Sequence, residues 1–357
     1  MKNNKKKMKP GIKIVIVIGI VILGLFVMWF SLTGPVKMGN KENIEVEIKT
    51  GTSRSAIGNT LKEKKVIRSA FMFKVYTVIV PTDHLKAGTY LFNQNMSLRE
   101  VVSELEKGSN YNPDLVVLTL KEGKRITDYA KLIADKTNNS YDSVINVFKD
   151  REYTKELINK YWFLTDKILD KNIYYPLEGY LFPDTYHFEN KDVEVKEIID
   201  KVLEETDNKL SEYRDELSKD PHYYMTMASV VELEGTNTTN RKMIVGIFKN
   251  RMSSGMNMGS DVTTYYALQK SMNQDLASSE FLVDNPYNTR SVNMIGKMPV
   301  GPICSSSLSS IDASLHPTDS DYLFFVADKH GNIYYTRTNA EHDKKVAEIK
   351  EKGDWIW

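Results

Sequence analysis

The sequence predicts an α+β protein in which an N-terminal membrane-spanning helix precedes a small mixed module and a larger, helix-rich domain. Three observations lead to this prediction. An uncharged, mainly aliphatic run covers residues 14–36, and two series of strand-like and helical patterns follow it. The non-periodic stretch Asn110–Pro113, which reads NYNP, separates the two series. About 320 residues follow the run, which is enough for two domains with cores of their own.

The run at residues 14–36 is long enough to cross a bilayer. It contains 23 residues without a charge, and a spanning helix needs about 20. A cleaved signal peptide is the alternative, but its apolar core is usually about 7–15 residues long, and no A-x-A-like site follows this run. The preceding segment 1–13 carries Lys2, Lys5, Lys6, Lys7, Lys9 and Lys13. The positive-inside tendency therefore predicts a single-pass anchor with a cytoplasmic N-terminus and an exterior chain after Val36.

Residues 44–110 predict a small module of order β-α-α-β-α. The first strand is expected at Val46–Thr50, and a helix with Ile57, Leu61 and Val66 inward follows it. The later elements are a helix at Ala70–Ile79, a hairpin-like segment at Leu85–Phe92 and a helix at Leu98–Glu106. Ser97 is placed to cap the last helix, and Gly108 to stop it.

Residues 113–352 predict the larger α+β domain. A strand is expected at Leu115–Leu120, and a closing hairpin at Tyr322–Asp328 and Asn332–Thr336. Helical periodicity covers Ile126–Asp135, Tyr141–Lys149, Val193–Lys209, Thr239–Met252, Val262–Ser271 and Ala340–Lys352, in addition to the helix that ends near Gly235.

Composition and motifs exclude several classes of function. The net charge is +1, and no basic stripe with interleaved aromatic residues indicates a nucleic-acid partner. Cys304 is the single cysteine, so an intrachain disulfide cannot form. The sequence contains no CxxC, HExxH, GxGxxG or P-loop pattern, and no two histidines lie four residues apart. We therefore expect neither a metal ion nor a cofactor.

A glutamate at the end of an apolar helix is the strongest catalytic candidate. Within Met225–Gly235, four residues share one helical face at spacing i, i+3, i+4 and i+7: Met227, Val230, Val231 and Glu234. Burial and the negative end of the helix dipole should both raise the pKa of Glu234, as acid catalysis of glycosidic cleavage requires. Glu232 is expected to point elsewhere. A solvated helix end with two ordinary glutamates stays open as the alternative.

Other candidates each have a structural alternative. Four tyrosines could stack on sugar faces or could belong to the core: Tyr186, Tyr265, Tyr266 and Tyr287. Asp184 could orient a substrate or form a turn after Pro183, and Glu178 could be a second acid or a turn residue. The run Cys304–Ser307 contains possible nucleophiles, but it precedes a helical pattern and lacks G-x-S-x-G, so an N-cap cluster is favoured.

Several segments together resemble one family across essentially the whole chain. In order they are Leu177–Tyr186 (LEGYLFPDTY), Ala228–Glu234 (ASVVELE), Asn250-Arg251, Ser260-Asp261, Pro286–Thr289 (PYNT), Gly301–Ile303 (GPI) and Tyr322–Val326 (YLFFV). These segments, and their order, are similar to those of the YceG-like (MltG) endolytic murein transglycosylases.

The resemblance implies an enzyme of the bacterial cell membrane that cuts nascent glycan strands internally during cell wall biogenesis. It implies a LysM-like module at 44–110 and a YceG-like catalytic domain at 113–352. Peptidoglycan would be the substrate, and peptidoglycan synthases with division or elongation proteins would be partners. The family's catalytic acid corresponds to Glu234. The candidates for supporting catalytic or substrate contacts are Glu232, Asp184, Tyr186, Asp261, Tyr287 and Asn288.

Three positions depart from the family's pattern. Gly259 stands where glutamine is common, Val262 where proline is common, and Gly235 where threonine or alanine is frequent. These differences leave the acid in place and bear on the glycan contacts of the loop at residues 256–263.

The implied reaction breaks the bond between MurNAc and GlcNAc. Its glycosidic oxygen must be protonated while an oxocarbenium-like centre develops. A lytic transglycosylase uses the sugar's own C6 hydroxyl and forms a 1,6-anhydro ring, so one carboxyl group can act first as acid and then as base. Two alternatives remain open: a hydrolytic muramidase, which needs a second carboxylate or a bound water, and a non-catalytic wall-binding scaffold.

Overall fold

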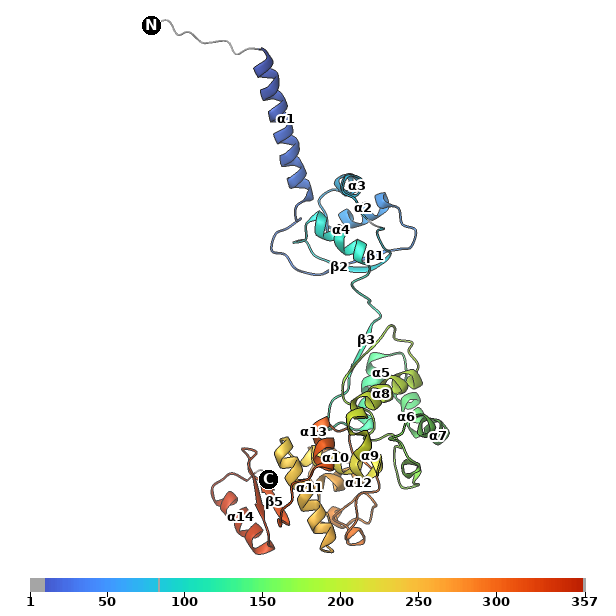
Figure 1. Cartoon of the computed structure of the whole chain (residues 1–357), viewed down its shortest axis with the longest axis vertical. Coiled ribbons are helices and arrows are strands. Elements are labelled where there is room, and N and C mark those ends of the chain that lie inside the picture. Colours follow the sequence, from blue (N-terminus) through green and yellow to red (C-terminus); the bar gives the residue numbers. More distant parts are fainter. Residues whose placement is uncertain (1–9, 83, 356–357) are drawn as a thin grey trace, which may run out of the picture. The chain divides into compact units, whose positions relative to one another are not determined.

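The computed structural model describes residues 10–82 and 84–355 (Figure 1). The chain divides into two compact units, Met1–Asp114 and Leu115–Trp357, which are described separately. Most of the basic tail predicted at residues 1–13, including Lys2, Lys5, Lys6, Lys7 and Lys9, lies outside the described residues.

The first unit begins with the long apolar helix α1 (Pro10–Thr33). Its 24 residues correspond to about 36 Å of helix, which exceeds the roughly 30 Å hydrocarbon thickness of a bilayer. The window Ile16–Thr33 has a mean hydropathy of 2.6, and no residue in it is fully buried inside the protein. The helix ends before Gly34 and Pro35, which do not favour its continuation. By length and composition, α1 can cross a membrane. It covers most of the span predicted at residues 14–36.

A two-stranded antiparallel sheet and helices on it form the rest of the first unit. β1 (Ile44–Ile48) pairs with β2 (Gly88–Phe92), so that Val46 lies opposite Tyr90. The connecting helices are α2 (Arg54–Glu63) and α3 (Ala70–Ile79), and α4 (Leu98–Lys107) follows. The predicted order β-α-α-β-α is therefore confirmed.

The prediction of a hairpin-like segment at Leu85–Phe92 is wrong, because the strand in this segment does not pair locally. β2 pairs with β1, which lies about 40 residues earlier in the chain, because alternate residues of both strands enter one core. The helix after it is as expected. Ser97 and Glu100 form a capping box at its start, and Gly108 follows its end with a φ of +113°.

The second unit opens with a short sheet and four helices that pack around it. β3 (Val116–Thr119) pairs antiparallel with β4 (Thr185–Phe188). The helices are α5 (Ile126–Lys136), α6 (Tyr141–Lys149), α7 (Arg151–Lys160) and α8 (Val195–Leu210). Neither β4 nor α7 was predicted. Asp150 ends α6 and caps α7 at the same time, so a single residue separates the two helices.

The next part of the second unit contains a buried helix, α10 (Pro221–Glu234), which follows the short α9 (Arg214–Leu217). The others are α11 (Thr238–Ser253), α12 (Asp261–Ala267), α13 (Leu308–Leu315), β5 (Phe324–Ala327), β6 (Ile333–Thr336) and α14 (Asn339–Glu351). α10 packs against α11, α12 and α13. The strands β5 and β6 form the predicted closing hairpin.

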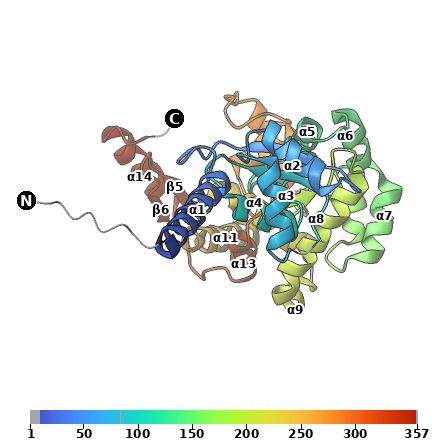
Figure 2. The same cartoon turned by 90° about the horizontal axis from the view of Figure 1, so that it is seen from above.

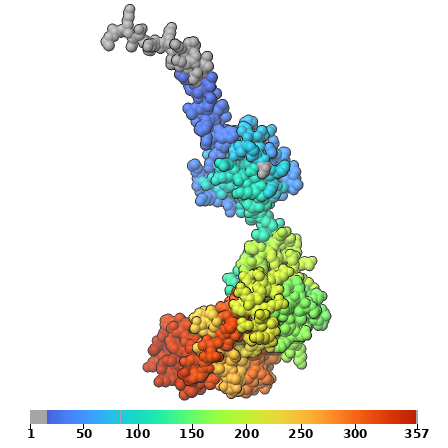
Figure 3. Space-filling model, viewed as in Figure 1, coloured from blue at the N-terminus to red at the C-terminus, as the bar shows by residue number. Residues whose placement is uncertain are grey.

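Within the second unit, the elements separate into two groups. In Figures 1 and 2, helices α5 to α8 gather on one side, and β5, β6 and α14 lie on the other. Figure 3 shows the C-terminal elements, coloured red, as a lobe of this unit. The predicted helix Val262–Ser271 is too long: α12 ends at Ala267, and Gln269 has a φ of +52°, which stops helical continuation.

Candidate active site

Glu234 is the last residue of α10, and its position follows from how that helix begins and ends. Asp220 caps the start of the helix by accepting from the Tyr223 N–H group, and Pro221 occupies the first turn. Met227, Val230 and Val231 are completely buried in one core cluster, as the helical face predicted. One turn further along this face, Glu234 reaches the edge of the core and is only partly buried.

The Glu234 side chain lines a cleft of about 520 Å³. The cleft lies between the C-terminal end of α10, the start of α12, and the hairpin β5–β6 with the segment after α14. Besides Glu234, its lining includes Arg251, Asp261, Tyr265, Arg290, Phe324 and Trp355. The cleft therefore combines charged groups near the acid with aromatic side chains on its walls.

The surroundings of Glu234 hold its pKa near neutrality. Burial raises the pKa to about 7, and the nearby Asp261 carboxylate acts in the same direction. Two groups lower it: the Ser260 hydroxyl, whose Oγ donates to Oε1 of Glu234 at 2.5 Å, and the Arg290 guanidinium. At neutral pH the carboxyl group is therefore about half protonated, so it can give a proton and take one back.

Glu232 points away from the cleft into a closed network. Its Oε1 accepts from Nη2 of Arg241 at 2.8 Å, and its Oε2 accepts from the Ser307 N–H group, the Ser307 hydroxyl and the Ser310 hydroxyl at 2.8, 2.6 and 2.7 Å. Only 7% of the Glu232 side chain is exposed. Glu232 thus connects the end of α10 to the start of α13. From this position it can support catalysis only by holding α10 in place.

The last serine of the run before α13 caps that helix, in line with the N-cap interpretation favoured from the sequence. Ser307 is the N-cap residue, and its hydroxyl accepts from the Ser310 N–H group. Cys304 is completely buried, and burial raises the pKa of its thiol well above the usual range. A nucleophilic role for Cys304 is therefore not supported.

Asp261 is the supporting candidate that shares the cleft with Glu234. It is the first residue of α12 and forms an ion pair with Arg290. Its carboxylate is half exposed to the cleft, and its charge contributes to the raised pKa of Glu234.

Asp184 and Tyr186, which were predicted as supporting or substrate-binding residues, lie away from the cleft at Glu234. Both belong to the β4 region and line a separate cavity of about 460 Å³. Asp184 forms an ion pair with Lys209, with 3.3 Å between Oδ2 and Nζ. The Tyr186 side chain is buried, and its hydroxyl donates to the Phe182 carbonyl at 2.7 Å. Both are occupied in holding β4 against its neighbours.

Asn288 and Tyr287, the other predicted supporting residues, are buried beside α12 and are absent from the lining of the cleft. The Asn288 amide donates to the carbonyls of Phe281 and Val283, and its oxygen accepts from the Thr264 hydroxyl and the Arg290 N–H group. Tyr287 packs between Tyr174 and Tyr266, with ring centroids 5.0 and 4.7 Å away. The Asn288 side chain is thus fully engaged in positioning α12 and Arg290. The Tyr287 hydroxyl is buried without a hydrogen-bond partner in the described part of the chain.

Glu178 is a buried carboxyl group outside the cleft. Only 1% of it is exposed, and it accepts from the Ile126 N–H group and the Tyr266 hydroxyl, both at 3.0 Å. Burial raises its pKa to about 8. Because Tyr266 belongs to α12, this network links that helix to the start of α5.

Sequence reasoning missed the roles of two groups of residues around Glu234. Ser260 and Arg290 act directly on the ionisation of Glu234. The sequence signals for Ser260 were its place in the Ser260-Asp261 segment shared with the family and its position before a helix start. His342 and Trp355 come from the C-terminal lobe, and nothing local in the sequence indicates that they lie at the acid. Among the residues that the structure describes, no group of three or more His, Cys, Asp or Glu side chains could hold a metal ion.

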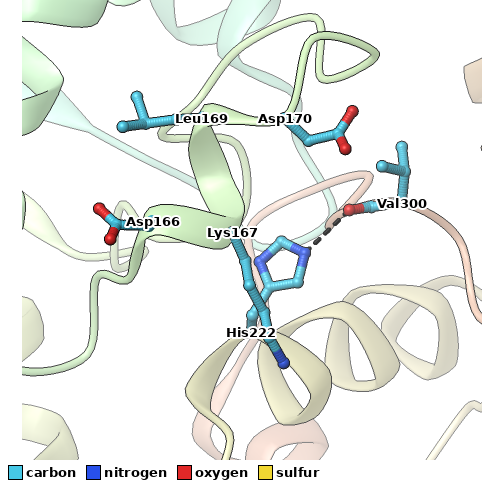
Figure 4. Close-up of a pocket in the computed structure, with 6 residues that line it drawn as sticks. All are labelled: Asp166, Lys167, Leu169, Asp170, His222 and Val300. Carbon is cyan, nitrogen blue, oxygen red and sulfur yellow. Dashed lines mark hydrogen bonds between the residues drawn. The ribbon is translucent and has the colours of Figure 1, made fainter.

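A further cavity of about 360 Å³ lies at the other end of α10 (Figure 4). His222 faces it, and both ring nitrogens are engaged: Nε2 with the Val300 carbonyl at 2.8 Å and Nδ1 with the Tyr180 hydroxyl at 2.9 Å. Twelve residues separate His222 from Glu234 along the helix, or about 18 Å. Since its histidine is committed to holding the fold, this cavity is a weaker candidate than the cleft at Glu234.

The chain is similar to several known proteins over most of its length. The model of the YceG-like family matches residues 46–348. An endolytic murein transglycosylase of Bacillus subtilis (strain 168) is 34% identical over 340 residues, covering 94% of this chain and 93% of that protein. An endolytic murein transglycosylase of Streptococcus pneumoniae serotype 2 (strain D39) is 31% identical, and the match covers 88% of this chain but 60% of that longer protein.

A solved structure is also similar. The crystal structure of a YceG-like protein from Listeria monocytogenes has a TM-score of 0.61 and 36% sequence identity, and the match covers 85% of this chain and 99% of that one. The family match extends over most of the sequence, from the first strand of the small module to α14. The chain therefore belongs to the YceG-like family.

Proposed function

We propose that this chain is a membrane-anchored lytic murein transglycosylase that cuts MurNAc–GlcNAc bonds within nascent peptidoglycan strands. The observation that carries the proposal is a single carboxyl group, Glu234, whose pKa is raised to about 7 and which lines an open cleft. The endolytic murein transglycosylases to which the chain is similar support the choice of substrate.

Glu234 supplies both proton transfers of the reaction. Its protonated carboxyl group donates to the glycosidic oxygen as the bond between C1 of MurNAc and that oxygen breaks. The resulting carboxylate then removes the proton from the C6 hydroxyl, whose oxygen bonds to C1 and closes the 1,6-anhydro ring. The products are an anhydro-MurNAc end and a free GlcNAc hydroxyl, and Glu234 is protonated again.

The other carboxylates near Glu234 favour this scheme over hydrolysis. A glycoside hydrolase uses a second carboxylate to activate water or to attack the sugar. Glu232 is enclosed by Arg241 and two serines, and Asp261 is paired with Arg290. Glu232 cannot reach a substrate, and Asp261 is held in its ion pair, whereas the intramolecular C6 hydroxyl requires no bound water.

The walls of the cleft are suited to an amphipathic sugar chain. Tyr265, Phe324 and Trp355 offer aromatic surface for the apolar faces of sugar rings. Asp261 and Arg290 offer hydrogen-bonding groups for hydroxyl or N-acetyl substituents. We assign substrate contact to this set in place of the buried Asn288 and Tyr287.

The remaining parts of the chain position the catalytic domain at the membrane. Residues 14–36 anchor the protein, the tail at 1–13 stays in the cytoplasm, and residues 44–110 act as a LysM-like module. The apolar α1 and the β1-α2-α3-β2 order support these assignments. The domain at 113–352 then works outside the cell membrane, next to the synthases and division or elongation proteins that supply nascent strands.

The test compares the full-length wild type with Glu234→Gln in bilayers that contain uncrosslinked nascent glycan. Products are identified by mass spectrometry, and Glu204→Gln, which changes an exposed carboxylate on α8, is the matched control. Anhydro-MurNAc ends from the wild type and the control, but not from Glu234→Gln, are expected. Reducing ends would instead indicate a muramidase. Full cellular function of Glu234→Gln would indicate a scaffold.

A further inference from the structure

The helix α3 of the first unit is apolar on its exposed side as well as on its buried side. Met72, Phe73 and Thr77 face the core. Phe71, Val78 and Ile79 are 72, 70 and 64% exposed. Exposed large apolar side chains concentrated on one ten-residue helix indicate a surface that is covered by something other than water.

The end of α1 is fastened next to this helix. Arg68, two residues before α3, donates from Nε to the Pro35 carbonyl at 2.8 Å and from Nη1 to the Ser31 carbonyl at 2.9 Å. The Trp29 ring stacks on the Tyr76 ring of α3, with centroids 6.1 Å apart. Trp29 also packs against the core of the module. α1 and the module are therefore joined by direct contacts as well as by the chain.

These contacts set the depth of α3 relative to a bilayer. Trp29 lies in the last turns of the apolar window Ile16–Thr33, where aromatic residues occupy the membrane–water interface. Tyr76 is in ring contact with Trp29 and so lies at nearly the same depth. Val78 is two residues from Tyr76, about 3 Å along the helix axis. Figure 1 shows α3 on the side of the first unit from which α1 extends.

We propose that α3 lies in the headgroup region of the same bilayer that α1 crosses, with Phe71, Val78 and Ile79 as its lipid contacts. This inference rests on the proposed anchoring by α1. An interfacial helix typically buries its apolar face about 5–10 Å into the boundary of headgroups and acyl chains. Lys74, exposed on the same face as Phe71 and Val78, then meets anionic phosphates. The module is thereby attached to the membrane surface at two points.

The experiment uses the full-length chain in vesicles of phosphatidylethanolamine and phosphatidylglycerol. A fluorescent thiol probe is placed at Val78→Cys, and at Glu47→Cys as the control, which is an exposed acidic position on β1. Cys304 is buried, so the probe attaches to the introduced cysteine, and labelled wild type checks this. A nitroxide lipid with its quencher near the headgroup reports contact with the bilayer surface.

We expect about two-fold or stronger quenching at position 78 and less than about 1.2-fold at position 47, because a shallow quencher reaches only groups within the interface. Equal, weak quenching at both positions would overturn the proposal. So would a probe at position 78 that is shielded but unquenched, since a protein surface would then cover α3.

Two further measurements on the same vesicles separate this proposal from the proposed function. Alkaline extraction reports whether α1 is inserted, and glycan cleavage reports activity. An inserted, active protein without quenching at position 78 would overturn the docking of α3 alone. Release of the protein by alkali would overturn the anchoring and, with it, the docking.

Discussion

Removal of the Ser260 hydroxyl should move the pH dependence of catalysis. The Oγ of Ser260 donates to Oε1 of Glu234 at 2.5 Å and so stabilises the ionised carboxylate. A hydrogen bond to a charged group contributes about 1.5–3 kcal/mol, and one pKa unit corresponds to about 1.4 kcal/mol. Ser260→Ala should therefore raise the pKa of Glu234 by about 1–2 units from its present value of about 7.

The sign of the effect on activity follows from the role of the group. A general acid works in its protonated form, so activity falls as the pH rises through its pKa. At pH 8 only about one wild-type molecule in ten is protonated at Glu234, whereas at least about half of the Ser260→Ala molecules would be. The alkaline limb of the pH–rate profile should shift upward by about 1–2 pH units, even where the weaker acid lowers the maximal rate.

The assay is the initial rate of formation of anhydro-MurNAc ends between pH 5 and 10, measured by mass spectrometry. Ser310→Ala is the matched control, because its hydroxyl donates to Glu232, the other acid of the E-x-E pair, at 2.7 Å. The alkaline limb of the pH–rate profile of Ser310→Ala should lie at the same pH as that of the wild type. An unchanged or lowered limb for Ser260→Ala would refute the assignment of Glu234 as the acid whose ionisation Ser260 controls.

Three further predictions concern stability. The pKa of Glu178 is raised to about 8, so its protonated form stabilises the fold at low pH. Up to about 5 kcal/mol is then lost as the pH rises from about 4.5 to about 8, and Glu178→Gln should remove this part of the pH dependence in thermal unfolding, leaving the smaller part due to Glu234. Glu232→Ala should lower the free energy of unfolding in urea by about 3–5 kcal/mol, because Arg241 loses its buried carboxylate partner. Gly259→Ala should lower the melting temperature and the activity, since its φ is +73° and a Cβ would lie 2.6 Å from Nη2 of Arg251 in the cleft.

Each of these predictions has a control or a contrary outcome. A Glu178→Gln protein that loses stability with rising pH as the wild type does would contradict the buried carboxyl as the cause. Glu152→Ala breaks an exposed ion pair with Lys155 and should cost less than about 1 kcal/mol. Gly331→Ala has a similar φ of +80° with open space around it, so it should lower stability without lowering activity.

Local signals in the sequence predicted the helices well where a cap, a periodic face and a stop residue occur together. Ser97 and Gly108 bound α4 in this way. β4 was missed because it is only four residues long, and its partner β3 lies almost 70 residues earlier. α12 was predicted too long because the apolar pattern continues past Ala267, whereas the backbone turns at Gln269. Pairing between distant segments has no local signal.

For the site, helical periodicity and family motifs carried different kinds of information. Periodicity separated Glu234 from Glu232, since residues two apart on a helix point in different directions. The family motif that contains Asn288 and Tyr287 predicted that they support the acid. A motif does not distinguish a side chain that contacts a substrate from one that supports a loop. The structure buries Asn288 and Tyr287 and leaves Asp261 in the cleft.

The sequence by itself determined the apolar span, the order of the small module, the helix that carries Glu234 and the face on which that residue lies. These properties depend on residues within one or two helical turns of each other. Only the tertiary structure decided that burial raises the pKa of the acid while Ser260 and Arg290 lower it. It also decided that Trp355 and Phe324 line the cleft, and that Asp184 and Tyr186 do not. Burial, hydrogen bonding and charge depend on distances between segments that are far apart in the chain, and those distances are set by packing.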